Sequence, residues 1–316
     1  MKHYFILNPA AGKADRTTEL TRKIADLCKA KGLAYSVAIS HAAGQCETLA
    51  RRFAASGEPC RIYACGGDGT LNEVVNGCVG QPNVAVTHYP IGSGNDFIKS
   101  SSNPAAFSSM ECLLDPEEAM FDLIEVGDRY GLNICSVGID ARICTGISTY
   151  KRLPLVSGPG AYFISTAVNV LKGIHRHYIV EVDGQVFDGE RTMICVCNGR
   201  WYGSGFYPVP DAVLNDGLLD VLLVAPVSRL QVASLIGKYK AGHYREYPAL
   251  ISHFRVPAIT VHCDVCSEVN MDGEILMAKD ITFRISEQKL RFFYPKGLSW
   301  SPSLAAQAMC DVACSQ

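Results

Sequence analysis

Short apolar segments alternate with amphipathic ones along the first third of the chain. The apolar segments, each typical of a buried strand, occupy residues 4–7, 35–39, 62–65 and 84–87. The segments with apolar side chains at helical spacing occupy residues 15–30, 46–55 and 71–78. This alternation predicts a three-layer α/β domain, in which helices cover both faces of a parallel sheet.

The pattern changes near residue 121, where strand-like segments dominate. They occupy residues 121–126, 130–137, 178–182, 191–198, 218–224, 258–262, 268–271 and 281–286. Asp183-Gly184 separates two of these runs and is typical of a tight hairpin. Helices are expected at 160–173 and 228–242. The second part of the chain therefore reads as a mainly antiparallel β domain.

Composition narrows the class of protein. The chain has 316 residues, which is enough for two domains, and 48% of them are hydrophobic. A net charge of −2 gives no reason to expect nucleic acid as a partner. No run of about 18 uninterrupted apolar residues is present, so we expect a cytoplasmic protein whose membrane association is peripheral. Most of the 14 cysteines lie in apolar runs and are expected to be reduced and buried.

The segment Gly66-Gly67-Asp68-Gly69-Thr70 is the most informative motif. It lies between a predicted strand and a predicted helix, where glycines let the backbone approach a phosphate and the first helical N–H groups bind it. An acid at position 68 suits a metal bound through water or the acceptance of a proton. The plainer alternative is an ordinary turn, in which Gly, Asp and Thr are common.

Three other loops are expected at the same edge of the sheet. Asn8, Ser40 and Gly92 each follow a predicted strand, as Gly66 does. Ligands of open α/β sheets bind beyond the carboxyl ends of the strands, so these loops should converge on one site.

The glycine motif resembles the nucleotide-binding loop of diacylglycerol, sphingosine, ceramide and NAD kinases and of phosphofructokinases. Further segments resemble the bacterial diacylglycerol-kinase-type lipid kinases in the same order along the chain. These segments are Asn8–Lys13, Ile91–Phe97, Asn198–Phe206, Pro210–Ala212, Asn215–Asp220 and Met271–Glu274. The resemblance implies an α/β nucleotide-binding domain at 1–120 and a β-sandwich acceptor domain at 121–289. It also implies a return to the first domain at 290–306, which leaves 307–316 as a tail.

The resemblance implies ATP as the phosphoryl donor. The residues expected to contact ATP are Asn8, Gly12, Lys13, Ser40, Gly66, Gly67, Asp68, Gly69, Thr70, Asn72, Glu73 and Ser93. Ser40 has an equally good alternative as a helix N-cap. Asp68 and Asp96 are expected to hold Mg²⁺ through water. A separate structural Mg²⁺ is implied at Asp216 with the carbonyls of Val213 and Leu218, although Asn215 replaces a second acid that is common in the family.

The resemblance also places the catalytic base. Asp272 and Glu274 flank Gly273, and the family assigns its base to this motif. Glu274 is the favoured base, followed by Asp272 and then Asp68, because sphingosine kinases use the glycine loop. A plain Asp-Gly turn is the alternative. Asp140 occupies the position of an acid that contacts the acceptor in related sphingoid kinases, and strand-end capping is its alternative.

The expected function is transfer of the γ-phosphoryl group of ATP to a lipid hydroxyl, with diacylglycerol as the default acceptor and phosphatidic acid as the product. The alternatives are another lipid alcohol (a sphingoid base, a monoacylglycerol or a polyprenol), an NAD-kinase-like enzyme, and a binding module without activity. The expected partners are a lipid acceptor met transiently at a membrane surface and a second copy of the chain in a homodimer.

Overall fold

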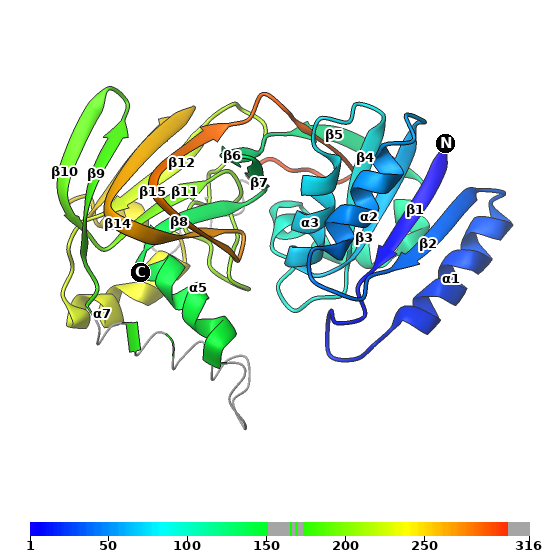
Figure 1. Cartoon of the computed structure of the whole chain (residues 1–316), viewed down its shortest axis with the longest axis horizontal. Coiled ribbons are helices and arrows are strands. Elements are labelled where there is room, and N and C mark those ends of the chain that lie inside the picture. Colours follow the sequence, from blue (N-terminus) through cyan, green and yellow to red (C-terminus); the bar gives the residue numbers. More distant parts are fainter. Residues whose placement is uncertain (151–164, 166–167, 170–172, 303–316) are drawn as a thin grey trace, which may run out of the picture. The chain divides into compact units, whose positions relative to one another are not determined.

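The structure is a computed structural model that describes residues 1–150, 165, 168–169 and 173–302. The chain forms two compact units (Figure 1). The first comprises Met1–Leu123, Val213–Asp216 and the described residues of Ser286–Gln316. The second comprises Ile124–Ala212 and Gly217–Ile285. The expected helix at 160–173 and the expected tail at 307–316 lie largely or wholly outside the described residues.

The first unit contains a six-stranded sheet. Its strands, in spatial order, are β2 (Ala34–Ile39), β1 (Lys2–Leu7), β3 (Cys60–Gly66), β4 (Val84–Pro90), β16 (Leu290–Pro295) and β5 (Pro116–Phe121). The first five strands are parallel, and β5 is antiparallel to β16. The helices are α1 (Thr17–Ala30), α2 (Gln45–Ala54) and α3 (Asp68–Cys78) and the short α4 (Met110–Leu113), η1 (Phe97–Ser100) and η2 (Pro104–Ser108). The expected α/β domain with a parallel sheet is confirmed.

The expected strands at 121–126 and 130–137 were wrong, and the second is divided into two strands at 129–131 and 134–138. Residues 121–126 read as a single strand of the second domain, but the structure divides them. Phe121 ends β5 in the first sheet, and β6 begins at Ile124 in the second unit. The segment 116–120 has two acids and few apolar residues, so its pattern gave no strand signal. Pairing with β16 makes it a strand.

The second unit is an antiparallel sheet of ten strands. The main path runs β13 (Ile251–Val256), β12 (Leu219–Val224), β11 (Met193–Cys197), β8 (Ile134–Gly138), β14 (Ala258–Met271), β15 (Glu274–Ile285), β6 (Ile124–Val126) and β7 (Arg129–Gly131). A hairpin of β9 (Arg176–Val182) and β10 (Gln185–Arg191) pairs with β14. The helices are α5 (Ile139–Tyr150), α7 (Arg229–Lys240) and the short η3 (Tyr244–Glu246).

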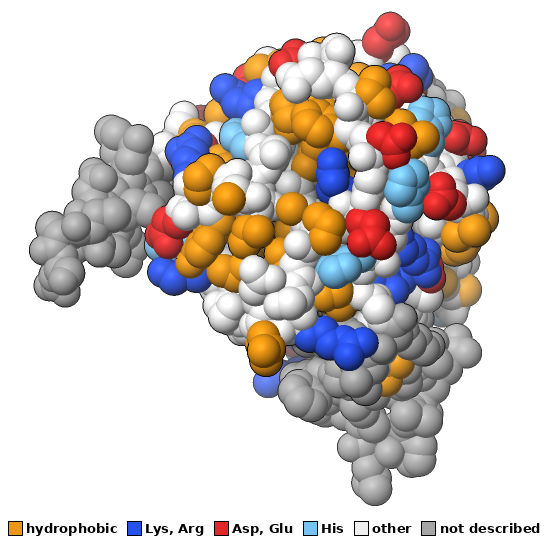
Figure 2. Space-filling view, turned by 90° about the vertical axis from the view of Figure 1, so that its left-hand side faces the viewer, with side chains coloured by type: hydrophobic (Ala, Val, Ile, Leu, Met, Phe, Trp, Pro, Cys, Tyr) orange, Lys and Arg blue, Asp and Glu red, His pale blue; other side chains and the backbone are white. Residues whose placement is uncertain are grey.

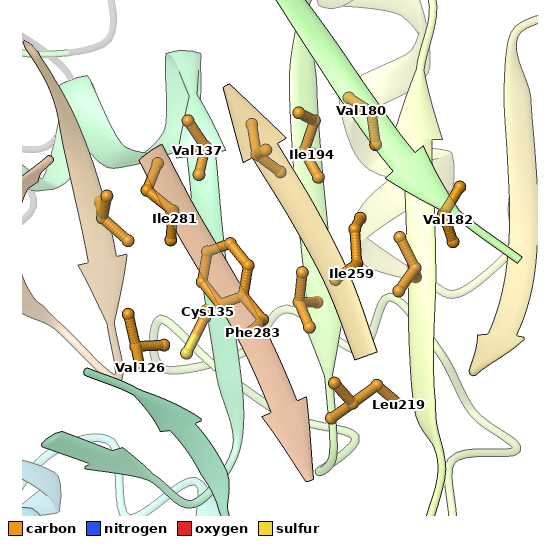
Figure 3. Close-up of a cluster of buried hydrophobic side chains, with 14 of the residues drawn as sticks. Val126, Cys135, Val137, Val180, Val182, Ile194, Leu219, Ile259, Ile281 and Phe283 are labelled. Atoms are coloured by element: carbon orange, nitrogen blue, oxygen red, sulfur yellow. The ribbon is translucent and has the colours of Figure 1, made fainter. Parts of the chain in front are cut away.

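Strand β14 organises this unit. Its first half pairs with β9, its last residues pair with β8, and the register with β15 shifts between His262 and Ser267. Such a bulge bends a strand and increases its twist. Apolar side chains of these strands form one buried core, including Val180, Ile194, Ile259 and Phe283 (Figure 3). A second core packs Cys195 and Leu222 with Ile139 and Ile143, which lie in α5, and with the partly buried Val232 of α7.

Charged side chains are interspersed on the outer face of the second unit (Figure 2). On β9, His177 pairs with Asp188 and Asp264. On β14, His262 pairs with Asp280 and with Glu181. Within the described residues, no group of three or more His, Cys, Asp or Glu side chains is placed to hold a metal ion.

Candidate active site

Three loops of the first unit converge at the carboxyl edge of its sheet. They follow β1, β3 and β4. The Asn8 side-chain amide donates to the Thr70 hydroxyl at 2.9 Å, which joins the first loop to the second. The Gly66 carbonyl accepts from the N–H groups of Ile91 (2.8 Å) and Gly92 (3.2 Å), which joins the second loop to the third. The predicted convergence is therefore observed for these three loops.

Two glycines permit this close approach. A Cβ at Gly92 would lie 2.6 Å from the Cα of Gly67, which is backbone that cannot easily move aside. Gly12 has φ +82°, and a Cβ there would lie 2.7 Å from the Ile91 carbonyl oxygen. Any larger residue would push the loops apart.

The N-terminus of α3 is open to a ligand. The helix begins at Asp68, and the N-cap Gly67 contributes no side-chain cap. The backbone N–H groups of the first turn are therefore available to an anion, and the helix dipole favours negative charge there. Gly12, Lys13, Gly69 and Ser93 are all exposed around this point. The arrangement has the features of a phosphate site.

The Asp68 carboxylate also joins two loops. Its oxygens accept from the backbone N–H groups of Asn95 (2.7 Å) and Asp96 (2.5 Å). Asp96 is buried and its carboxylate accepts from the Lys99 ammonium at 2.6 Å. The two acids expected at a cation are thus adjacent. Both Asp68 oxygens and one Asp96 oxygen already have protein partners, so a role of this pair at Mg²⁺ stays a prediction.

Other residues expected at ATP have protein partners of their own. The Glu73 carboxylate accepts from Gly44 N and Cys46 N, each at 3.0 Å, and so satisfies the start of α2. Asn72 is buried and accepts from the Asn76 amide. Ser40 is buried and its hydroxyl donates to the Leu7 carbonyl at 3.4 Å, while Gly44 is the N-cap of α2. The contact of these residues with ATP stays a prediction.

Sequence reasoning missed His88. This residue of β4 is fully buried, and its Nε2–H donates to the Gly66 carbonyl at 3.0 Å, the same oxygen that joins the second and third loops. Burial lowers the pKa of His88 to about 4. The neutral ring therefore supports the glycine loop. No local pattern distinguishes this histidine from other residues of an apolar strand.

We expect His88 to make the protein less stable in acid. An unfolded histidine takes up a proton near pH 6.5, whereas folded His88 does so only near pH 4. Stability should therefore fall as pH decreases from about 6.5 toward 4, by at most about 1.4 kcal/mol per pH unit for this one group. His88→Gln keeps an N–H donor and removes the proton uptake, so its free energy of unfolding in urea should vary less between pH 7 and 5. An unchanged pH dependence would contradict this role.

In the second unit, Asp272 and Gly273 form the turn between β14 and β15. Both have positive φ, 50° and 97°, as a two-residue hairpin turn requires. The Asp272 carboxylate accepts from the backbone N–H groups of Leu132 (2.5 Å), Asn133 (3.1 Å) and Ile134 (2.9 Å). Asp272 therefore fixes the segment between β7 and β8. Glu274 is partly exposed and pairs with Arg129 at 3.0 Å.

These contacts predict different effects on stability. Asp272→Asn places an amide NH₂ against backbone N–H groups and should lower the free energy of unfolding by about 1–3 kcal/mol. Asparagine tolerates positive φ, so the turn itself remains allowed. Glu274→Gln loses only a partly exposed ion pair and should cost less than about 1 kcal/mol. Urea denaturation of both variants checks this, and an equal loss would show that Asp272 is not the structural member of the pair.

Asp140 lies at the wall of an apolar cavity within the second unit. Its carboxylate accepts from the hydroxyls of Ser136 (2.6 Å) and Tyr202 (3.4 Å). Burial raises the pKa of Asp140, and these hydrogen bonds oppose the rise. The cavity has a volume of about 110 Å³. Its apolar lining includes Ile139, Ile143, Met193, Phe206, Val224, Val232, Leu235, Ile236 and Leu250.

Helix α7 forms one wall of this cavity. Val232, Leu235, Ile236 and Tyr239 face it, yet no residue of α7 is buried. The helix begins with a capping box, in which Ser228 and Gln231 satisfy each other's backbone N–H groups. Val232 and Tyr239 are partly buried and pack against the second core, which holds the helix over the cavity.

The segment expected to hold a structural Mg²⁺ contains a boundary between the two units, between Asp216 and Gly217. Val213 and Asp216 belong to the first unit, and Leu218 belongs to the second. Its role as a metal site stays a prediction.

Comparison with known proteins identifies the family. Residues 2–126 match the diacylglycerol kinase catalytic domain, and residues 133–294 match the YegS C-terminal NAD kinase beta sandwich-like domain. The chain belongs to the diacylglycerol kinase and YegS-like lipid kinase family. Members of this family are kinases that act on an alcohol, so the chain is an enzyme of this class and the implied donor is ATP. The resemblance deduced from the motifs is confirmed.

Individual relatives agree. The chain is 26% identical to "Diacylglycerol kinase" of Staphylococcus epidermidis over 97% of this chain and 96% of that protein. It is 30% identical to "Probable lipid kinase YegS-like" of Pseudomonas aeruginosa over 75% and 77% of the two chains. The crystal structure of a diacylglycerol kinase from Bacillus anthracis has the same fold, with a TM-score of 0.66, 19% identity and coverage of 93% and 97%. No helix in the described part of this lipid kinase is long and apolar enough to span a membrane.

Proposed function

We propose that this lipid kinase transfers the γ-phosphoryl group of ATP to the hydroxyl of diacylglycerol, producing phosphatidic acid. The observation that carries the proposal is the apolar cavity with Asp140 in its wall. An apolar lining suits an acyl chain, and a buried carboxyl beside two tyrosine hydroxyls suits an alcohol at its polar side. The name of the Staphylococcus epidermidis relative supports diacylglycerol.

The three glycine loops would hold the triphosphate. The backbone at Gly12, Gly69 and Ser93 and the Lys13 ammonium are exposed and would bind the phosphate oxygens. Asp68 and Asp96 would hold Mg²⁺, which would neutralise charge on the transferred group. Val213, Asp216 and Leu218 would hold a second, structural Mg²⁺.

Glu274 would be the base. As the acceptor oxygen bonds to the γ-phosphorus, the bond to the β-phosphate oxygen breaks, and the hydroxyl proton passes to the Glu274 carboxylate. Asp272 would orient this segment, because its own oxygens already accept backbone N–H groups. Asp68 would be the base only if Glu274 proved dispensable.

A neutral alcohol suits the cavity better than the other acceptors do. The Asp140 carboxylate already accepts hydrogen bonds from the Ser136 and Tyr202 hydroxyls, so it suits the hydroxyl of an acceptor. An apolar cavity offers little to the polar NAD molecule. The names of the YegS-like relatives keep another lipid alcohol, such as a monoacylglycerol or a polyprenol, as the second candidate. The acceptor would be taken from a membrane surface during transient, peripheral contact, and a homodimer is compatible with this.

The test is transfer of labelled phosphate from ATP to diacylglycerol, monoacylglycerol, sphingosine, a polyprenol or NAD. Asp140→Asn should raise the KM for the lipid by about 10- to 100-fold, which corresponds to the loss of a hydrogen bond to a charged group, and should leave the KM for ATP unchanged. The control is Asp188→Asn, an exposed acid on β10. Transfer to NAD alone, or a higher KM for ATP only, would contradict the proposal.

A further inference from the structure

A buried arginine lies outside both parts of the active site. Arg142 of α5 is 8% exposed, and its Nε and Nη2 groups have no hydrogen-bond partner in the described part of the chain. The Tyr178 hydroxyl on β9 is likewise buried without a partner there. Buried polar groups are nearly always hydrogen-bonded, and leaving charged ones unpaired is costly. Such a group is therefore a candidate for an external ligand.

Positive charge exceeds negative charge around this arginine. Arg176, also on β9, bonds to Ser267 (3.3 Å) and Glu268 (3.2 Å) on β14. Helix α5 packs against β14, and β14 pairs with β9 at Tyr178, so these elements are neighbours. Burial and, after it, the charge of Arg176 lower the pKa of Arg142, while Tyr178 and Glu268 oppose the shift. The Glu268 carboxylate is thus opposed by two guanidinium groups, those of Arg142 and Arg176.

This cluster is distinct from the acceptor cavity. Arg142 follows Asp140 by two positions, which turns their side chains about 200° apart around a helix. Among the described residues, the lining of the cavity includes Asp140 but not Arg142. The lipid kinase reaction as proposed above makes no use of Arg142, Arg176 or Tyr178.

We infer that Arg142, Arg176 and Tyr178 form a second anion site, which binds a phosphate group. The Nε and Nη2 atoms of an arginine present two parallel N–H groups, which match two oxygens of a phosphate, and the tyrosine hydroxyl donates to a third. Glu268 holds Arg176 in place and limits the net charge of the cluster to +1. The phosphate can belong to an anionic phospholipid headgroup or be free in solution, and the two sources share this chemistry.

The test uses the full chain with saturating ADP, so that the nucleotide loops are occupied. Thermal melting is measured with increasing inorganic phosphate, and co-sedimentation is measured with vesicles of phosphatidylcholine alone or with phosphatidylglycerol added. Arg142→Gln removes the charge and the paired N–H groups, Arg142→Lys keeps only the charge, and Tyr178→Phe removes only the hydroxyl. Arg22→Gln, an exposed arginine of α1, is the charge-matched control.

The site predicts a tenfold or larger loss of anion affinity in Arg142→Gln, smaller losses in Arg142→Lys and Tyr178→Phe, and none in Arg22→Gln. If inorganic phosphate raises the melting temperature of the wild type but not that of Arg142→Gln, free phosphate is a ligand of the site. If Arg142→Gln no longer binds vesicles that contain phosphatidylglycerol, and inorganic phosphate does not change the melting temperature of the wild type, the ligand is a lipid headgroup. Equal responses of wild type and Arg142→Gln to both probes would overturn the inference. Arg142→Gln removes an unpaired buried charge, so it should melt no lower than the wild type without anion.

Discussion

Replacing Asp68 with asparagine is expected to lower kcat by about 100- to 1,000-fold. The carboxylate supplies charge for the proposed Mg²⁺ and accepts the N–H groups of Asn95 and Asp96. An asparagine side chain keeps one of these acceptors, turns an NH₂ group toward the other N–H, and loses the negative charge. The measurement is steady-state transfer of phosphate from ATP at several Mg²⁺ concentrations.

The Mg²⁺ series distinguishes the two roles of Asp68. If its charge helps to hold the ion, Asp68→Asn should need more Mg²⁺ for half-maximal activity. If it only joins the loops, the melting temperature should fall and the Mg²⁺ requirement should stay the same. Asp26→Asn, an exposed acid of α1, is the control and should behave as the wild type. Near-wild-type turnover of Asp68→Asn would contradict the role at Mg²⁺, and an unchanged melting temperature would contradict the role in joining the loops.

Glu274→Gln is expected to lower kcat by about 100- to 10,000-fold while the KM for ATP stays within a few-fold of the wild type. A base acts as the acceptor hydroxyl loses its proton, so its loss affects the transition state and not the binding of ATP. The fold should be retained, because Glu274 is partly exposed and makes one ion pair.

The matched control for Glu274 is Asp280→Asn on the same strand, β15, where the carboxylate is exposed. It should leave kcat unchanged. A Glu274→Gln variant with normal kcat and a raised KM for ATP would make Glu274 a nucleotide contact. The base would then be Asp68.

Much of the candidate site follows from local sequence. The pattern at 62–78 encodes a buried strand, a glycine turn and a helix that begins at Asp68, because each of these depends on neighbouring residues. Parallel strands bring their carboxyl ends to one edge, so the meeting of the loops at Asn8, Gly66 and Gly92 also followed from the predicted order of elements. The Asp-Gly turn at 272–273 was recognisable for the same local reason.

Contacts between distant segments decided the rest. The strand at 116–121 exists because residues 290–295 pair with it, and its own composition does not favour a strand. The partner of His88 is the Gly66 carbonyl, 22 residues away in the chain. Those of Asp272 are the N–H groups of Leu132 to Ile134, which lie 138 to 140 residues away. The burial of the Arg142 Nε and Nη2 groups, without a hydrogen-bond partner among the described residues, depends on how α5 packs against β14. Sequence alone determined which elements form and which family motifs they carry. Only tertiary packing decided which carboxylates are committed to backbone N–H groups and which charged groups are buried, because these depend on neighbours far apart in the chain.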